Sequence, residues 1–450
     1  MSSAPKDLSR PGRKLGAFVV LICLSLAVWT GCGDVFRPTA NPIPGPTADP
    51  RNFHIAVVVS RNSVGNPGSG MQIDVSGDSQ VGVVSAGQQP LYAALLPQAA
   101  RVFVSNSDGT ITSFTPAAAV ASIGIPTTIS LPPGLTPGFL FSTESATMYA
   151  ATSGSTSACS NAPNTGAVAA INATTLVVEN TICVGPNPTV LTETPNGQKV
   201  YSINSDGTLS SINTADNSVN PPISSPPLTQ PVGVVASLDN SEIFVLDASG
   251  VVWLINTLTD QVSVPPATAP PSSNFMALES TRNRLYVTSL GSGSGPPTLT
   301  ILDASTPSLS PLNRRALPLP TGATPVMVSF LPNGTRAYVL SITAANSPLV
   351  SVIDTATNAF LNTISLPAAT ANPSAVTACQ APGVHPFSMA ASGNSTRLYV
   401  TNCYAGSTSI IDTSSNTQVL AMNSPTSAYP PVHGSAYPPP ENPVFVVTGP

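Results

Sequence analysis

The side chains of this chain that could take part in chemistry are mostly neutral, and they recur in front of prolines. They are Gln89, Thr136, Asn187, Gln230, Thr324, His385 and Asn442, and Asn274 stands where one further pair is expected. Amides and hydroxyls can hydrogen-bond an uncharged polar ligand such as a glycan or a peptide backbone. His385 is the only titratable member, so it is the best single candidate for acid–base work or ligand contact. We predict that these eight residues form a ligand-binding site. The alternative is that they only satisfy backbone groups where strands begin.

The sequence does not supply a catalytic or metal-binding constellation around His385. His54 lies in the context of an outer strand and His433 in a proline-rich stretch, so no Ser-His-Asp grouping can be assembled, and no Gly-x-Ser-x-Gly segment is present. The residues before the prolines lack the carboxylates that hold a divalent cation, and no CxxC or HxxxH spacing indicates zinc. We expect no metal and no cofactor.

These residues are spaced as if each belonged to one repeat. The polar-proline pairs recur every 43 to 61 residues, apart from one double gap that Asn274-Phe275 would fill. A β-branched run with a central aromatic follows each pair, and its apolar and polar positions alternate as in a half-buried strand. The central residues are Phe103, Tyr149, Tyr201, Phe244, Tyr286, Tyr338 and Tyr399, with Val57 in the same phase. We expect these side chains to pack between repeats.

Two further strands complete each repeat. A third run ends in Asp or Asn followed by small polar residues, as in Ile353-Asp354 and Ile411-Asp412, and an Asx side chain there can close a turn into a fourth strand. Asn-Ser-Asp-Gly-Thr occurs twice, at 106–110 and 204–208, and we interpret both copies as hairpin turns rather than calcium loops. A four-stranded sheet of this size cannot bury both faces alone, so the repeats must stack into a ring.

The chain ends indicate how the ring closes. The repeat that begins at Phe53 lacks an opening strand, whereas residues 442–448 form an opening strand with no repeat behind it. Pairing the two would complete the first sheet and remove exposed strand edges. The sequence therefore predicts an all-β propeller of four-stranded antiparallel blades, eight by repeat count with seven as the alternative, closed by its terminal strands.

The repeat motifs resemble a known family. Leu398-Tyr399-Val400-Thr401-Asn402 and the segment 284–288, with Ile353-Asp354-Thr355-Ala356-Thr357-Asn358 downstream, are similar to the YVTN class of β-propeller repeats. The resemblance spans residues 53–450. It implies a propeller fold but little about function, because similar propellers serve as surface proteins, lactonase-like hydrolases and subunits of redox enzymes.

The first 52 residues are typical of an exported, anchored protein. Residues 1–31 combine four basic residues with the apolar stretch from Leu15 to Val28, as in a secretory signal peptide. Gly31-Cys32 resembles a lipoprotein cleavage site, which would make Cys32 the lipidated first residue. Residues 32–52 are rich in proline and would act as a tether. We expect a bacterial envelope lipoprotein, periplasmic or on the cell surface, with residues 53–450 as its propeller.

Four cysteines remain once Cys23 and Cys32 are set aside. An even number suits an oxidising compartment, and three pairings are possible. We favour Cys159 with Cys183 and Cys379 with Cys403, because each pair lies within one predicted sheet and encloses a similar loop.

Charge limits the possible partners. Residues 32–450 contain 11 basic and 19 acidic residues, and Lys199 is their only lysine, so we expect no nucleic-acid binding. We expect a monomeric, lipid-anchored scaffold that binds a protein or glycan partner at the envelope without catalysis. The alternative function is a lactonase-like hydrolase with its site at the mouth of the ring.

Overall fold

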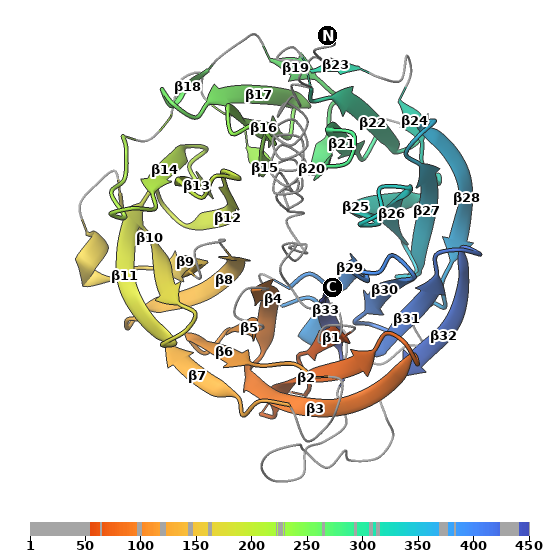
Figure 1. Ribbon diagram of the computed structural model, residues 1–450, viewed down its shortest axis with the longest axis horizontal. Helices are drawn as coiled ribbons and strands as arrows, with labels where there is room; N and C mark the ends of the chain where they lie inside the picture. Colours follow the sequence, from red (N-terminus) through yellow and green to blue (C-terminus); the bar gives the residue numbers. More distant parts are fainter. Residues whose placement is uncertain are drawn as a thin grey trace, which may run out of the picture.

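The computed structural model shows eight antiparallel sheets arranged radially around a common axis (Figure 1). It describes residues 55–63, 65–96, 101–117, 123–142, 147–160, 164–221, 223, 228, 230–262, 266–291, 295–305, 309–311, 316–368, 377–381, 384–423 and 441–449. The fold is a β-propeller in which each sheet is one blade. The predicted all-β class and the count of eight blades are confirmed, and the alternative count of seven is wrong.

In blades 1 to 4, successive strands run outward from the axis. Blade 1 contains β33 (Pro443–Thr448), β1 (Ile55–Ser60), β2 (Pro67–Asp74) and β3 (Ser79–Gln88). Blade 2 contains β4 (Pro90–Leu96), β5 (Arg101–Asn106), β6 (Thr110–Phe114) and β7 (Thr127–Ser130). Blade 3 contains β8 (Leu135–Ser142), β9 (Thr147–Gly154), β10 (Gly166–Asn172) and β11 (Val177–Val184), with the 3-10 helix η2 (Ser157–Cys159) after β9. Blade 4 contains β12 (Pro188–Glu193), β13 (Lys199–Asn204) and β14 (Leu209–Asn213), and two isolated bridges from β14 take the place of a fourth strand.

Blades 5 to 8 repeat this order. Blade 5 contains β15 (Pro231–Ala236), β16 (Glu242–Asp247) and β17 (Val251–Asn256), with β18 (Gln261–Val262) and β19 (Ala267–Thr268) both paired to β17. Blade 6 contains β20 (Ser273–Glu279), β21 (Arg284–Ser289) and β22 (Thr298–Asp303), with β23 (Ser310–Pro311) and β24 (Leu317–Pro318) both paired to β22. Blade 7 contains β25 (Ala323–Phe330), β26 (Arg336–Thr343), β27 (Pro348–Asp354) and β28 (Ala359–Ser365). Blade 8 contains β29 (Phe387–Ala391), β30 (Arg397–Asn402), β31 (Ser407–Asp412) and β32 (Thr417–Asn423).

The two ends of the chain close the ring as predicted. β33 pairs antiparallel with β1, so that Val57 lies opposite Val447 and Val58 opposite Val446. The Gly449 amide extends the pairing by donating to the Ile55 carbonyl at 2.9 Å. β33 also lies between the innermost strands of its neighbours, β29 and β4, so blade 1 joins both ends of the array (Figure 1).

The central side chain of each second strand is buried, which confirms its predicted packing role. All eight are at most 2% exposed. Three tyrosines also donate a hydrogen bond from their hydroxyl to the turn between the third and fourth strands of the next blade. These bonds join Tyr149 to Asn217 (3.2 Å), Tyr201 to Asp260 (2.6 Å) and Tyr338 to Asn416 (3.0 Å).

Where the second strand carries phenylalanine, the facing turn carries leucine. Phe103 and Leu176 belong to one hydrophobic cluster, and Phe244 and Leu309 belong to another. Both leucines adopt positive φ, a conformation that is unfavourable for Leu. We attribute this to the apolar contact, because a polar residue there would face a ring without a hydrogen-bonding group.

Both favoured disulfides are present and share a sequence separation of 24. Cys159 in η2 joins Cys183 in β11, and Cys379 joins Cys403, which follows β30. The predicted signal peptide, the predicted lipidation site Cys32 and the predicted tether lie outside the described residues. Within the described part of the chain, no helix is long and apolar enough to cross a membrane.

Candidate functional site

The candidate site lies at the end of the ring where the innermost strands begin, which we call the rim. Gln89, Asn187, Gln230 and Asn442 each directly precede an innermost strand, and each adopts positive φ between 41° and 56°. The prolines that follow have fixed φ and no N–H, so the residue before each one turns the chain from the previous blade into the strand. The structure thus brings these four predicted residues to equivalent places around one end of the ring.

The register in blade 6 differs from the one predicted. Ser273 pairs with Ser289 in the same way that Pro90 pairs with Asn106, so Ser272 is the equivalent of Gln89. Ser272 also has the positive φ of the other rim residues, at 61°. Asn274 lies two residues further on, inside β20, where its amide donates to Pro325 O and its side-chain oxygen accepts from Thr288 Oγ1. The sequence points to Asn274 instead of Ser272, because blade 6 has Ser273 where the other blades have a proline after the rim residue.

Two threonines hold a rim position within a longer strand. Thr136 in β8 pairs with Ser153, and Thr324 in β25 pairs with Ile342. Neither has positive φ, since both innermost strands begin before their proline. Thr324 is exposed and Thr136 is half-buried.

A backbone hydrogen bond fixes the rim in six blades. In each, the residue after the second strand donates its amide to a carbonyl at or next to the rim position. The bonds run from Arg61 to Asn442, Ser107 to Gln89, Ser205 to Pro186, Ala248 to Gln230, Leu290 to Ser272 and Cys403 to Pro386, at 2.9 to 3.2 Å. The main chain of these residues, or of a neighbouring residue, thus takes part in the turns where the innermost strands begin. The Asn187 and Gln230 side chains nevertheless remain exposed, and among the described residues they have no hydrogen-bond partner.

The two Asn-Ser-Asp-Gly-Thr segments are hairpin turns, as predicted, and they brace the rim. In blade 2, the Asp108 carboxylate accepts from the Thr110 amide within the turn and from the Gln88 amide at 2.8 Å. The Asn106 amide lies so close to Gly87 that a Cβ there would be 2.5 Å from Asn106 Nδ2. Blade 4 repeats this contact between Gly185 and Asn204. The turn therefore holds the residues just ahead of Gln89 and Asn187.

His385 occupies the rim position of blade 8. The residue is exposed, and partial desolvation by nearby protein lowers the pKa of its imidazole. Among the described residues, it makes no hydrogen bond or ion pair. The segment that carries it is attached to β30 by the Cys379–Cys403 disulfide and by the Cys403 amide, which donates to Pro386 O at 2.9 Å. His385 therefore sits on a restrained loop as a neutral group near neutral pH.

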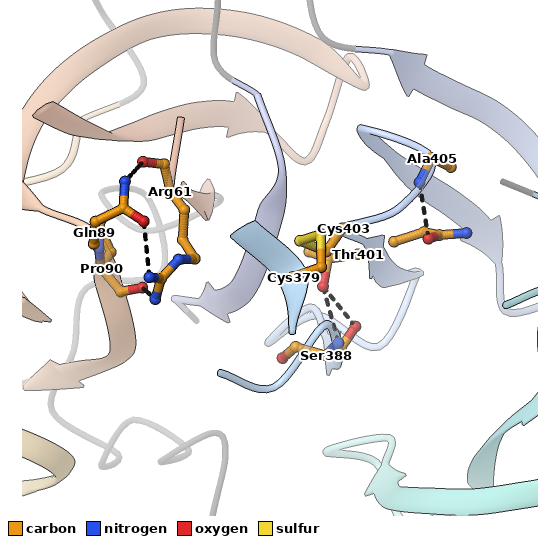
Figure 2. The surroundings of a disulfide bond; sticks show 9 residues. Arg61, Gln89, Pro90, Cys379, Ser388, Thr401, Cys403 and Ala405 are labelled. Atoms are coloured by element: carbon orange, nitrogen blue, oxygen red, sulfur yellow. Dashed lines mark hydrogen bonds between the residues drawn. A yellow bond between two sulfur atoms is a disulfide. The ribbon is translucent and has the colours of Figure 1, made fainter. Parts of the chain in front are cut away.

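Sequence reasoning missed Arg61, which lies between two rim residues. It follows β1, and its guanidinium crosses to blade 2, where Nη1 donates to Pro90 O at 3.0 Å and Nη2 to Gln89 Oε1 at 2.8 Å (Figure 2). The side chain is 3% exposed, and desolvation lowers its pKa. In the sequence, Arg61 is a single arginine after a β-branched run. Nothing in that pattern indicates that its side chain reaches a neighbouring repeat.

The described rim offers hydrogen-bonding groups rather than a reaction centre. No group of three or more His, Cys, Asp or Glu side chains that could hold a metal ion occurs in the described part of the chain. Arg61 and His385 are its basic side chains, and they belong to the adjacent blades 1 and 8. Such a ring can orient a polar ligand by its amides and hydroxyls.

Comparisons with known proteins agree with the propeller fold. No family model matches the sequence, and no curated protein matches it significantly. The structure is similar to the dihydro-heme d1 dehydrogenase NirN in complex with DHE, with a TM-score of 0.62 and 10% identity over 90% of this chain and 76% of that one. It is also similar to AztD from Citrobacter koseri, with a TM-score of 0.56 and 12% identity over 88% and 97% of the two chains. The C-terminal WD40 domain of Sif2 gives a TM-score of 0.53 and 13% identity over 74% and 85%. At these identities, the similarity establishes the β-propeller fold alone.

Proposed function

We propose that this protein is an exported, lipid-anchored binding scaffold whose rim recognises a polar partner at the cell envelope without catalysis. The observation that carries the proposal is the rim itself. Amide and hydroxyl side chains from successive blades meet at one end of a rigid ring, and several lie on backbone with positive φ. Such conformations cost free energy and are often retained where they present a side chain to a ligand.

The exposed amides of blades 4 and 5 provide the direct test. The full-length protein, kept in detergent, would be screened on a glycan array, and the affinity for any bound glycan measured by calorimetry. The double variant Asn187→Ala/Gln230→Ala should weaken binding about tenfold or more, because each lost amide removes hydrogen bonds to the ligand. Gln261→Ala on the outer strand β18 is the matched control and should have no effect. Binding that withstands the double variant would place the ligand elsewhere.

Export and anchoring form a separate part of the proposal. Two disulfides suit an oxidising compartment, and Cys32 is the residue proposed to carry the lipid. Expression with labelled palmitate should label the wild-type protein and leave Cys32→Ala unlabelled. Equal labelling of both would contradict lipidation at Cys32.

The alternative function is a lactonase-like hydrolase at the same rim. The lowered pKa of His385 favours it, because a neutral imidazole could accept a proton near neutral pH. Turnover of a sugar lactone above background, lost in His385→Ala, would replace the scaffold proposal with this one.

A further inference from the structure

Arg61 is a buried cation without a counterion among the described residues. It is 3% exposed, and both of its reported acceptors, the Pro90 carbonyl and the Gln89 amide oxygen, are neutral. Its Nε is buried without a hydrogen-bond partner. Burying a charged group in this way is costly unless an opposite charge compensates it. Lys199, Arg336 and Arg397 at the other end of the ring differ in this respect, since all three pair with aspartates.

A carboxylate on the neighbouring segment serves another purpose. Glu441 precedes the rim residue Asn442, and its backbone carbonyl accepts from the Asn62 amide, directly after Arg61. Its side chain is instead engaged by the Ser63 hydroxyl at 2.7 Å. The guanidinium is therefore left to neutral acceptors among the described residues, although Glu441 lies on the segment that bonds to Asn62.

The Gln89 side chain occupies the place beside the Arg61 guanidinium that a carboxylate could take. Its Oε1 accepts from Arg61 Nη2, and its Nε2 donates back to the Arg61 carbonyl at 3.4 Å. Gln89 is half-buried at the surface of the rim, with φ of 50°. A carboxylate in place of this amide could accept two parallel N–H bonds from the guanidinium and would also neutralise its charge.

We propose that the rim between blades 1 and 2 is a carboxylate subsite for an acidic glycan, in which a uronate displaces the Gln89 side chain and bonds to Arg61. The proposal rests on the proposed function and specifies its ligand. Sugar hydroxyls suit the neighbouring amides and hydroxyls of the rim. An extended peptide would instead need pockets for alternate side chains, and none of the predicted rim residues is apolar.

The test compares two probes that differ in charge. Calorimetry with the full-length protein would measure the affinity for trigalacturonate and for an uncharged galactose trisaccharide. We expect trigalacturonate to bind about tenfold more tightly to the wild type and this preference to disappear in Arg61→Gln. Arg101→Gln is the matched control, because Arg101 also lacks a carboxylate partner among the described residues but lies at the other end of blade 2, where it bonds to Ser113 and Thr115. It should keep the full preference.

A second variant separates binding from folding, since removal of a buried arginine can destabilise the protein. Gln89→Ala deletes the competing acceptor and should raise the ratio of trigalacturonate affinity to neutral trisaccharide affinity severalfold. An unchanged or lower ratio of the two affinities in Gln89→Ala would overturn the subsite even if Arg61→Gln does not fold. Equal affinity of the wild type for both probes would overturn the subsite and leave the scaffold proposal standing. Failure of both probes to bind would overturn the subsite together with the glycan form of that proposal.

Discussion

At the scale of single residues, the match between each second-strand aromatic and the facing turn shows how neighbouring blades are held together. Tyrosine meets Asn or Asp in the next blade, and phenylalanine meets leucine. The aromatic ring of Tyr or Phe buries its apolar area in both cases. The tyrosine hydroxyl adds a hydrogen bond only where the facing turn provides an acceptor. The side chain of the turn is thus part of the blade interface.

This arrangement predicts different outcomes for two similar substitutions. Tyr338→Phe removes the bond to Asn416 and should lower the free energy of unfolding by about 1 kcal/mol. Tyr399→Phe should be neutral or slightly stabilising, because the Tyr399 hydroxyl is buried without a hydrogen-bond partner. Denaturant unfolding of both variants would check the contrast, and an equal loss in both would contradict it.

Asp412 makes stability depend on pH in the acid range. Bonds from Ser414 and Ser415 lower the pKa of its carboxyl to about 2, and Arg397 donates to it at 2.7 Å. Since this pKa lies below the unfolded value near 4, the stabilisation is present above pH 4 and is lost between about pH 4 and pH 2. Asp412→Asn should destabilise the protein by ~1 kcal/mol at pH 7, after allowance for solvent screening, and by less at pH 2. Melting temperatures at both values would test this, and a loss independent of pH would contradict it.

Several residues of the candidate site could be predicted from the sequence, and others could not. Gln89, Asn187, Gln230 and Asn442 were placed correctly because the proline after each marks where a strand begins. Ser272 has no such marker, so Asn274 was placed in its position. Arg61 could not be predicted, since its partners belong to another blade and depend on how the side chain crosses between them.

At the scale of strands, the blades differ mainly at their outer edge. The chain has Pro221-Pro222 in blade 4, Pro265-Pro266 in blade 5, and Pro307 and Pro311 in blade 6, and these are the blades whose fourth strand is split or reduced to bridges. Proline cannot donate to a neighbouring strand and is tolerated at a sheet edge. The regular spacing of the inner strands could therefore be predicted, while the lengths of the outer strands could not.

The two disulfides allow a comparison at the same scale. Both enclose loops of equal length, so chain entropy predicts a similar contribution of about 3 kcal/mol from each. Cys379 and Cys403 are both buried, whereas Cys183 is only half-buried. A mild reductant should therefore open Cys159–Cys183 first, as mass spectrometry after thiol alkylation would show. Earlier labelling of Cys379 and Cys403 would contradict this order.

At the scale of the whole molecule, closure depends on β33. A chain that ends at residue 442 would lose the innermost strand of blade 1 and expose the edge of β1, so we expect it to aggregate or melt at a much lower temperature. A synthetic peptide of residues 441–450 should restore the melting temperature by pairing with β1. The same peptide with Val447→Pro should fail, because the Val447 amide faces β1. Rescue by both peptides would contradict the pairing.

The pairing of β1 with β33, in which Val57 lies opposite Val447, has a consequence for folding during synthesis. A polypeptide that emerges amino-terminus first delivers seven other blades and three strands of blade 1 before β33, the strand that completes blade 1, arrives. Until then, the edge of β1 that pairs with β33 is exposed, and the ring of blades stays open. Blade 1 can therefore be completed only after β33 has been synthesised.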